Sequence, residues 1–176
     1  AVEEAKKIAA ESNAFYVDQF NNPSSVKAHY YHTGPEIFSV LGKSINAFVA
    51  IVGSGGTFIG TSKYLKEKDA SIRCIAVEPR DAAFIKTGII INARHIIQGT
   101  GYCLIPPHWD SSIVDDIITV SDEEASSTKE LLGKQEGLFV GYSAGANVAA
   151  AIKHLSEIND DNYSVATVLC DTGFKY

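Results

Sequence analysis

Two glycine-containing turns carry the residues of this 176-residue chain that could do chemistry. The first follows a continuous apolar run and consists of Gly53, Ser54, Gly55, Gly56 and Thr57. Its glycines let backbone N–H groups converge without interference from Cβ atoms, and a helix beginning there adds its positive N-terminal dipole. The two hydroxyls can donate to the same anion. The turn therefore predicts a phosphate-binding site, with a plain strand-to-helix turn as the alternative.

The type of phosphate ligand is narrowed by the residues around this turn. A dinucleotide-binding fingerprint needs glycine where Phe58 stands, although Glu78 is suitably placed at the end of the next predicted strand. A nucleoside-triphosphate loop needs lysine after its last glycine, yet Gly60 is followed by Thr61 and Ser62. The prediction of dinucleotide binding is therefore weakened, and a nucleoside-triphosphate hydrolase is disfavoured.

The second turn, residues 141–145, reads Gly-Tyr-Ser-Ala-Gly and matches the nucleophile elbow of serine hydrolases. That reaction needs an acid and then a histidine after the serine, but no Asp or Glu lies between Ser143 and His154, the last histidine. We expect Ser143 instead to face a ligand and to offer its hydroxyl to a ring nitrogen. The alternative is that it only caps the following helix.

The elements that must position these turns alternate between strand and helix along most of the chain. Alternation of this kind predicts an α/β fold, with an open, mostly parallel sheet, helices on both faces and binding sites at the carboxyl ends of the strands. The predicted strands are residues 13–17, 47–52, 73–77, 116–120, 138–140 and 164–169. The predicted helices are residues 1–11, 33–41, 57–66, a capping-box helix from Ser121 to near Gly137, and 147–155.

Composition excludes several classes of function. The net charge of −6 and the lack of a Lys/Arg-rich run argue against nucleic acid and anionic membrane as partners. No apolar stretch approaches the roughly 20 residues of a membrane span, so a cytoplasmic protein is expected. The three cysteines are widely spaced and the five histidines lack metal-ligand spacing, so we expect neither a disulfide framework nor a metal.

Nine sequence blocks, in chain order, resemble the cysteine synthase and cystathionine β-synthase family of fold-type II pyridoxal-phosphate enzymes. The blocks are residues 19–23, 28–30, 33–37, 53–57, 77–79, 97–101, 121–124, 141–146 and 169–173. The resemblance implies the large-domain fold of these enzymes. It also implies that residues 53–57 bind the phosphate group of pyridoxal phosphate and that Ser143 forms a hydrogen bond with the pyridine nitrogen. Gln19 resembles a residue that helps to bind the substrate carboxylate, and Gly99 resembles part of a mobile segment lining the cleft. An ordinary loop amide and a turn glycine are the alternatives for these two.

The activity implied by this resemblance is β-replacement, in which O-acetylserine and sulfide give cysteine and acetate. A neutral serine does not stabilise a protonated pyridine ring, so the cofactor withdraws electrons less strongly. This favours β-elimination over reactions that need a more strongly stabilised carbanion. The Schiff-base lysine of the family belongs upstream of every block found here, so none of the chain's own lysines inherits its catalytic role. Two departures from the family pattern are residues 81–94, which lack its glycine-rich character, and Cys170, which replaces proline.

The resemblance also implies a domain division and partners. Residues 1–20 would end a small N-terminal domain, and residues 21–176 would form a large domain truncated at its C-terminus. A small amino acid would be the substrate, the enzyme would be a homodimer, and the C-terminal peptide of serine acetyltransferase is a possible partner. Alternatives are cystathionine β-synthase activity, serine or threonine deamination, a non-catalytic paralogue that binds a partner's C-terminal peptide, and, more remotely, a serine hydrolase.

Overall fold

The core of the protein is a four-stranded sheet with the order β3-β2-β1-β4, in which every pair of neighbours is parallel. The computed structural model describes residues 2–176. The strands are β1 (Ile45–Ile51), β2 (Arg73–Pro79), β3 (Asp116–Val120) and β4 (Ser164–Thr167). The central strand β1 is apolar except at Asn46, and its residues 47–51 are buried because both faces of the strand are covered. This arrangement confirms the predicted α/β class.

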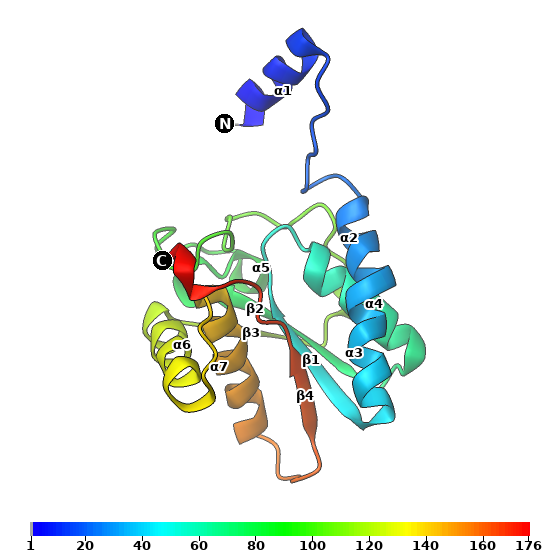
Figure 1. Cartoon of the computed structure of the whole chain (residues 1–176), viewed down its shortest axis with the longest axis vertical. Coiled ribbons are helices and arrows are strands. Elements are labelled where there is room, and N and C mark those ends of the chain that lie inside the picture. The colour runs from blue at the N-terminus through cyan, green and yellow to red at the C-terminus, as the bar shows by residue number, and fades with distance from the viewer. Residues whose placement is uncertain (1) are drawn as a thin grey trace.

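Helices cover both faces of the sheet (Figure 1). Alternate residues of β1 pack in two different clusters, one with each helical layer. Ala47, Val49 and Ile51 pack with α7, whereas Phe48 and Ala50 pack in a second cluster with residues of α4. The first layer contains α6 (Asp122–Glu136) and α7 (Tyr142–Ser156). The second contains α2 (Ser24–Ala28), a π-helical turn (His29–Thr33), α3 (Gly34–Leu41) and α4 (Gly56–Lys68), and the short α5 (Phe84–Thr87) follows β2.

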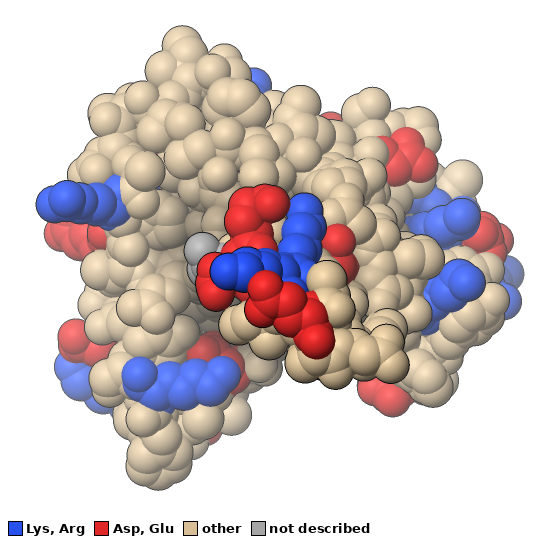
Figure 2. Space-filling model, turned by 90° about the horizontal axis from the view of Figure 1, so that it is seen from above, with Lys and Arg blue, Asp and Glu red and all other residues tan. Residues whose placement is uncertain are grey.

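The first helix, α1 (Val2–Ser12), stands apart from this body, and none of its residues is buried (Figure 1). Seen from above, the acidic and basic side chains of α1 lie side by side in one group (Figure 2). Lys6 pairs with Glu3 at 3.3 Å and Lys7 with Glu11 at 3.9 Å. Pairs at this spacing stabilise a helix by about 0.2–0.5 kcal/mol each, so local ion pairs rather than packing support α1. No helix within residues 2–176 combines the length and apolarity of a membrane span.

Three sequence expectations are corrected by the structure. Residues 13–17 form no strand, and Phe15 and Val17 are exposed, because no neighbouring strand of the described chain pairs with them. Residues 138–140 contribute only an isolated antiparallel bridge between Val140 and Thr172. Helix α7 begins at Tyr142, five residues earlier than predicted, because Gly141 adopts the extended N-cap conformation and Ser143 is already helical.

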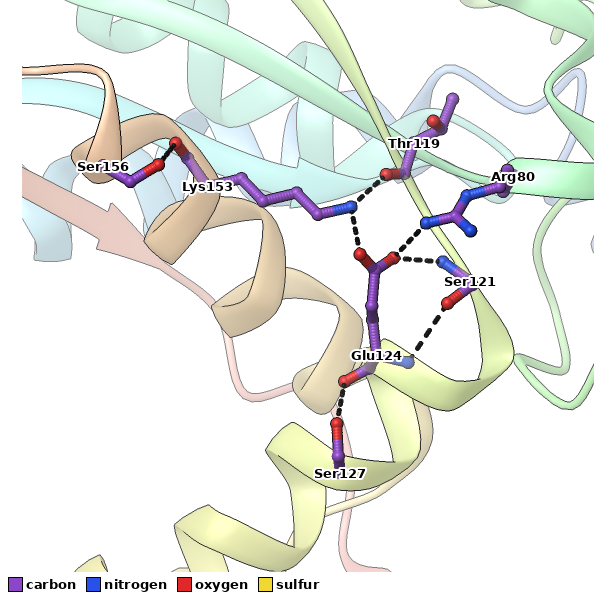
Figure 3. A network of polar contacts seen from close by, with 7 residues as sticks. All are labelled: Arg80, Thr119, Ser121, Glu124, Ser127, Lys153 and Ser156. Carbon is purple, nitrogen blue, oxygen red and sulfur yellow. Dashed lines mark hydrogen bonds and ion pairs between the residues drawn. The ribbon is translucent and has the colours of Figure 1, made fainter.

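A partly exposed network of polar contacts around Glu124 joins the sheet to the α6–α7 layer (Figure 3). Its carboxylate accepts hydrogen bonds from Lys153 Nζ and Arg80 Nη2, both at 2.8 Å, and from the Ser121 N–H at 2.7 Å. Ser121 completes the predicted capping box by accepting from the Glu124 N–H at 3.2 Å. Lys153 also donates to the Thr119 carbonyl of the edge strand β3. Burial alone would raise the pKa of Glu124, but the hydrogen bonds from Lys153 and Ser121 outweigh it, and the net pKa is lowered.

Replacing Glu124 with glutamine is expected to lower the free energy of unfolding by about 1 kcal/mol at neutral pH. Because the folded-state pKa is depressed, the carboxylate stabilises the fold above its ordinary pKa of 4.5, and this contribution is lost as the pH falls through the lower folded value. Urea unfolding at neutral pH and below about pH 4 should therefore show the difference between Glu124→Gln and the unmodified protein shrinking in acid. Glu123→Gln, an exposed neighbour in the same helical turn, is the control. A Glu124→Gln difference that is the same at both pH values would contradict this account.

Candidate functional site

Both glycine turns open into one cavity of about 210 Å³ at the carboxyl ends of the parallel strands. Segments that are far apart in sequence meet there because parallel strands place all their carboxyl ends at one edge of the sheet. Every site residue predicted from the sequence lines this cavity: Gln19, Gly53, Ser54, Gly55, Gly56, Thr57, Gly99 and Ser143. The lining within residues 2–176 includes no Asp or Glu, which suits an anionic ligand, and it includes no lysine.

The first glycine turn has the geometry of an anion cradle. Gly55 has a φ of +90°, in the left-handed region that favours glycine, and α4 begins at the next residue. Within the described chain, no N–H group of residues 54–57 donates to another protein group, so these donors are free for a ligand. A Cβ on Gly53 would lie 2.4 Å from the Gly99 carbonyl oxygen, so the turn and the 98–100 segment touch backbone to backbone.

Thr57, the last residue of the cradle, is hydrogen-bonded to a histidine that sequence reasoning did not select. His29 Nε2 lies 3.1 Å from Thr57 Oγ1, and His29 Nδ1 lies 2.9 Å from Thr33 Oγ1. Burial lowers the pKa of His29, which favours the neutral ring. The available signal was the block at residues 28–30, but nothing in the sequence indicated that it would meet a turn 28 residues later.

Ser143 lies in the first turn of α7 and is largely buried, with its side chain at the cavity. The N-cap of α7 is Gly141, and no side chain caps this helix end, so Ser143 does not serve as the cap. No side-chain hydrogen bond of the Ser143 hydroxyl is found within residues 2–176, and Ser143 lines the cavity. The hydroxyl is therefore available to a bound molecule.

Asn147 is a second residue that sequence reasoning missed as a site component. One helical turn after Ser143, it is fully buried; its Oδ1 accepts from the Ile51 N–H at 2.7 Å and its Nδ2 donates to the Val168 carbonyl at 2.7 Å. It thereby joins α7 to the end of β1, just before the cradle, and to the segment after β4. A single amide within an alanine-rich helix was the only sequence signal.

Cys170 is another lining residue of the cavity, and it follows the segment that Asn147 holds. Its Sγ lies 3.6 Å from Asn147 Nδ2. Burial, together with the negative charge of Asp171, raises the pKa of this thiol. Cys170 therefore adds a protonated, weakly polar side chain to the cavity wall.

A parallel α/β sheet with a glycine cradle, and with no acidic group lining the cavity within residues 2–176, is typical of proteins that bind a phosphate-bearing small molecule at the ends of their strands. The chain belongs to the family of pyridoxal-phosphate dependent enzymes, whose model matches residues 1–171. Pyridoxal phosphate is the cofactor of that family. The donor set fits it, since residues 53–57, whose N–H groups from 54 to 57 have no protein partner within the described chain, line the cavity together with the neutral Ser143.

Comparison with individual proteins supports the same family. The chain is 38% identical over 181 residues to a cysteine synthase from Helicobacter pylori and 35% identical over 184 residues to cysteine synthase A from Escherichia coli K12. Both matches cover 100% of this chain, and they cover 56% and 57% of those relatives. The crystal structure of an O-acetylserine dependent cystathionine β-synthase from Helicobacter pylori superposes with a TM-score of 0.93 at 37% identity, covering 100% of this chain and 56% of that one. The chain thus spans somewhat more than half the length of these relatives.

Proposed function

We propose that this chain is the cofactor-binding part of a β-replacement enzyme of the cysteine synthase type, which exchanges the acetate of O-acetylserine for sulfide. The observation that carries the proposal is the single cavity where the glycine cradle, Ser143, Gln19 and the 98–100 segment meet. The similarity to cysteine synthases supports the same reaction. Bound pyridoxal phosphate supplies an electron-withdrawing ring that acidifies the α-proton of an amino acid.

The cavity residues have distinct proposed roles. Residues 53–57 bind the phosphate through free N–H groups, through the Ser54 and Thr57 hydroxyls, and through the dipole of α4. Ser143 donates its hydroxyl to the pyridine nitrogen, and a neutral hydroxyl leaves that nitrogen unprotonated where a carboxylate would stabilise the protonated ring. Gln19 and Gly99 border the substrate carboxylate.

The amine that removes the α-proton is proposed to come from a part of the protein outside these 176 residues. Within residues 2–176 no lysine lines the cavity, and the chain covers 56% of the Helicobacter pylori cysteine synthase. In the same proposal residues 1–20 belong to a small domain and residues 21–176 to the large domain. The detached position of α1 supports this division (Figure 1). A homodimer, a serine acetyltransferase peptide as partner and a cytoplasmic location stay predictions.

A spectroscopic titration tests the proposed function on the complete protein that carries this sequence. Adding pyridoxal phosphate should produce a visible absorbance band that shifts when O-acetylserine is added, with cysteine formed once sulfide is present. Ser143→Ala should displace the band because the ring nitrogen loses its partner. A band that Ser143→Ala leaves in place would show that Ser143 is not the partner of the ring nitrogen. Absence of any band with the unmodified protein would reject the proposal.

Formation of cystathionine is the second candidate, favoured by the similarity to the O-acetylserine dependent cystathionine β-synthase structure. Both reactions use the same cavity and differ in the sulfur nucleophile. Competition between sulfide and homocysteine for one O-acetylserine-loaded protein separates them, because the ratio of cysteine to cystathionine reports which nucleophile the cavity prefers.

A further inference from the structure

A line of three polar side chains leads from the surface layer of helices into the phosphate cradle. Thr33 Oγ1 lies 2.9 Å from His29 Nδ1, and His29 Nε2 lies 3.1 Å from Thr57 Oγ1. All three side chains are partly buried. Within residues 2–176 no other hydrogen bond involves the side-chain polar atoms of these residues, so each hydroxyl has only the imidazole as its protein partner.

Two glycines of α4 hold His29 at this position. A Cβ on Gly60 would lie 2.3 Å from the Val26 carbonyl oxygen and 2.9 Å from His29 Cβ. A Cβ on Gly56 would lie 1.9 Å from Ser25 Oγ. Only residues without a side chain allow α2 and the π-helical turn to approach α4 this closely, and close packing fixes the direction of the imidazole.

The direction of the protons in this line follows from the ligand in the cradle. A threonine hydroxyl has one proton. If Thr57 donated it to His29 Nε2, only lone pairs would face the phosphate, which would repel that anion. A phosphate in the cradle therefore requires Thr57 to donate to it and to accept from an Nε2–H group. His29 Nδ1 is then unprotonated and accepts a hydrogen bond from the Thr33 hydroxyl.

We propose that His29 is a positioning residue of the phosphate cradle, which donates from Nε2 to Thr57 so that the Thr57 hydroxyl proton points at the phosphate. The inference rests on the proposed function, because it takes the phosphate of pyridoxal phosphate as the ligand. It adds a residue outside the glycine turn to the cradle and assigns its tautomer. Thr33 completes the line by holding Nδ1.

Comparing pyridoxal phosphate with pyridoxal, which lacks the phosphate, tests the proposal on the complete protein freed of cofactor. His29→Phe should weaken binding of pyridoxal phosphate about fivefold and leave pyridoxal binding nearly unchanged, because one hydrogen bond to the phosphate system is lost. His29→Gln should restore much of the affinity, since the glutamine amide can donate near the position of Nε2. His32→Phe, an exposed histidine of the same π-helical turn, should have no effect.

A double-mutant cycle separates positioning from general loosening of the fold. In a Thr57→Val background, His29→Phe should no longer weaken the binding of pyridoxal phosphate, because the hydroxyl that it positions is absent. Equal losses for pyridoxal and pyridoxal phosphate, or an undiminished loss in the Thr57→Val background, would overturn the proposal. If the unmodified protein binds neither compound, the proposed function itself fails, and this outcome is distinct from the failure of His29 alone.

Nitrogen-15 spectroscopy of the unmodified, pyridoxal-phosphate-loaded protein gives a readout that does not depend on any variant folding. His29 should be a neutral ring with its proton on Nε2 and with Nδ1 accepting. Phosphorus-31 resonances of the bound phosphate should shift in His29→Phe and return toward the unmodified position in His29→Gln. A ring with its proton on Nδ1 alone would mean that Thr57 donates to His29, and the proposal would be wrong.

Discussion

Replacing Gly53 with alanine is expected to weaken the binding of pyridoxal phosphate at least about tenfold and to destabilise the fold by about 1–3 kcal/mol. The added Cβ would lie 2.4 Å from the backbone oxygen of Gly99. No rotamer change relieves a contact with backbone. The preceding residues cannot retreat either, since Ile51 is in register with Val77 and its N–H is held by Asn147. The 98–100 segment must therefore move, and it lines the proposed cofactor cavity.

Gly133→Ala is the matched control for this change. Gly133 is an exposed position inside α6, where a Cβ would meet nothing closer than the Leu138 carbonyl oxygen at 3.9 Å. Alanine in a helix interior is favoured over glycine by about 1 kcal/mol, so this variant should be as stable as the unmodified protein or more so. Thermal unfolding and a pyridoxal phosphate titration on both variants give the comparison. Unchanged cofactor affinity in Gly53→Ala would refute the backbone contact as a determinant of the site.

Replacing Asn147 with leucine is expected to lower the free energy of unfolding by about 3 kcal/mol. Leucine has nearly the same size, so packing is preserved and the loss comes from hydrogen bonding. The buried Ile51 N–H and the partly buried Val168 carbonyl each lose a 2.7 Å partner, and an unsatisfied buried polar group costs about 1–3 kcal/mol. The effect should reach the cradle, because Ile51 lies two residues before Gly53.

Urea unfolding combined with amide hydrogen exchange measures this effect. Exchange at Ile51 should accelerate more in Asn147→Leu than the global loss of stability accounts for, because its acceptor has gone. Asn162→Leu, at an exposed position with no side-chain hydrogen bond within residues 2–176, should change stability by less than about 0.5 kcal/mol. A loss below about 1 kcal/mol in Asn147→Leu would show that these buried groups find other partners.

Several features of this protein could be predicted from its sequence because they depend on contacts between residues that are close in the chain. The apolar run before Gly53 predicts a strand covered on both faces, and the structure confirms it as the central β1. The capping box at Ser121 and Glu124 and the left-handed Gly137 at the end of α6 are contacts between residues close in sequence. The same holds for the cradle, since a few consecutive residues determine where a glycine turn begins a helix. Patterns of this kind depend on short-range geometry alone.

The remaining features depend on strand pairing and on packing between segments that are far apart in the sequence. Residues 13–17 and 138–140 have strand-forming side chains, yet they form no strand because neither segment has a neighbouring strand to pair with along its length.

Likewise, His29 and Asn147 carry no local signal of their roles. Each acquires its role from a partner 28 or 96 residues away, through contacts at Thr57 and Ile51. The sequence by itself thus determined the glycine turns and the alternation of strands and helices. Only the tertiary structure brought both turns, Gln19 and Gly99 to one cavity, because the parallel strand order sets which carboxyl ends are neighbours.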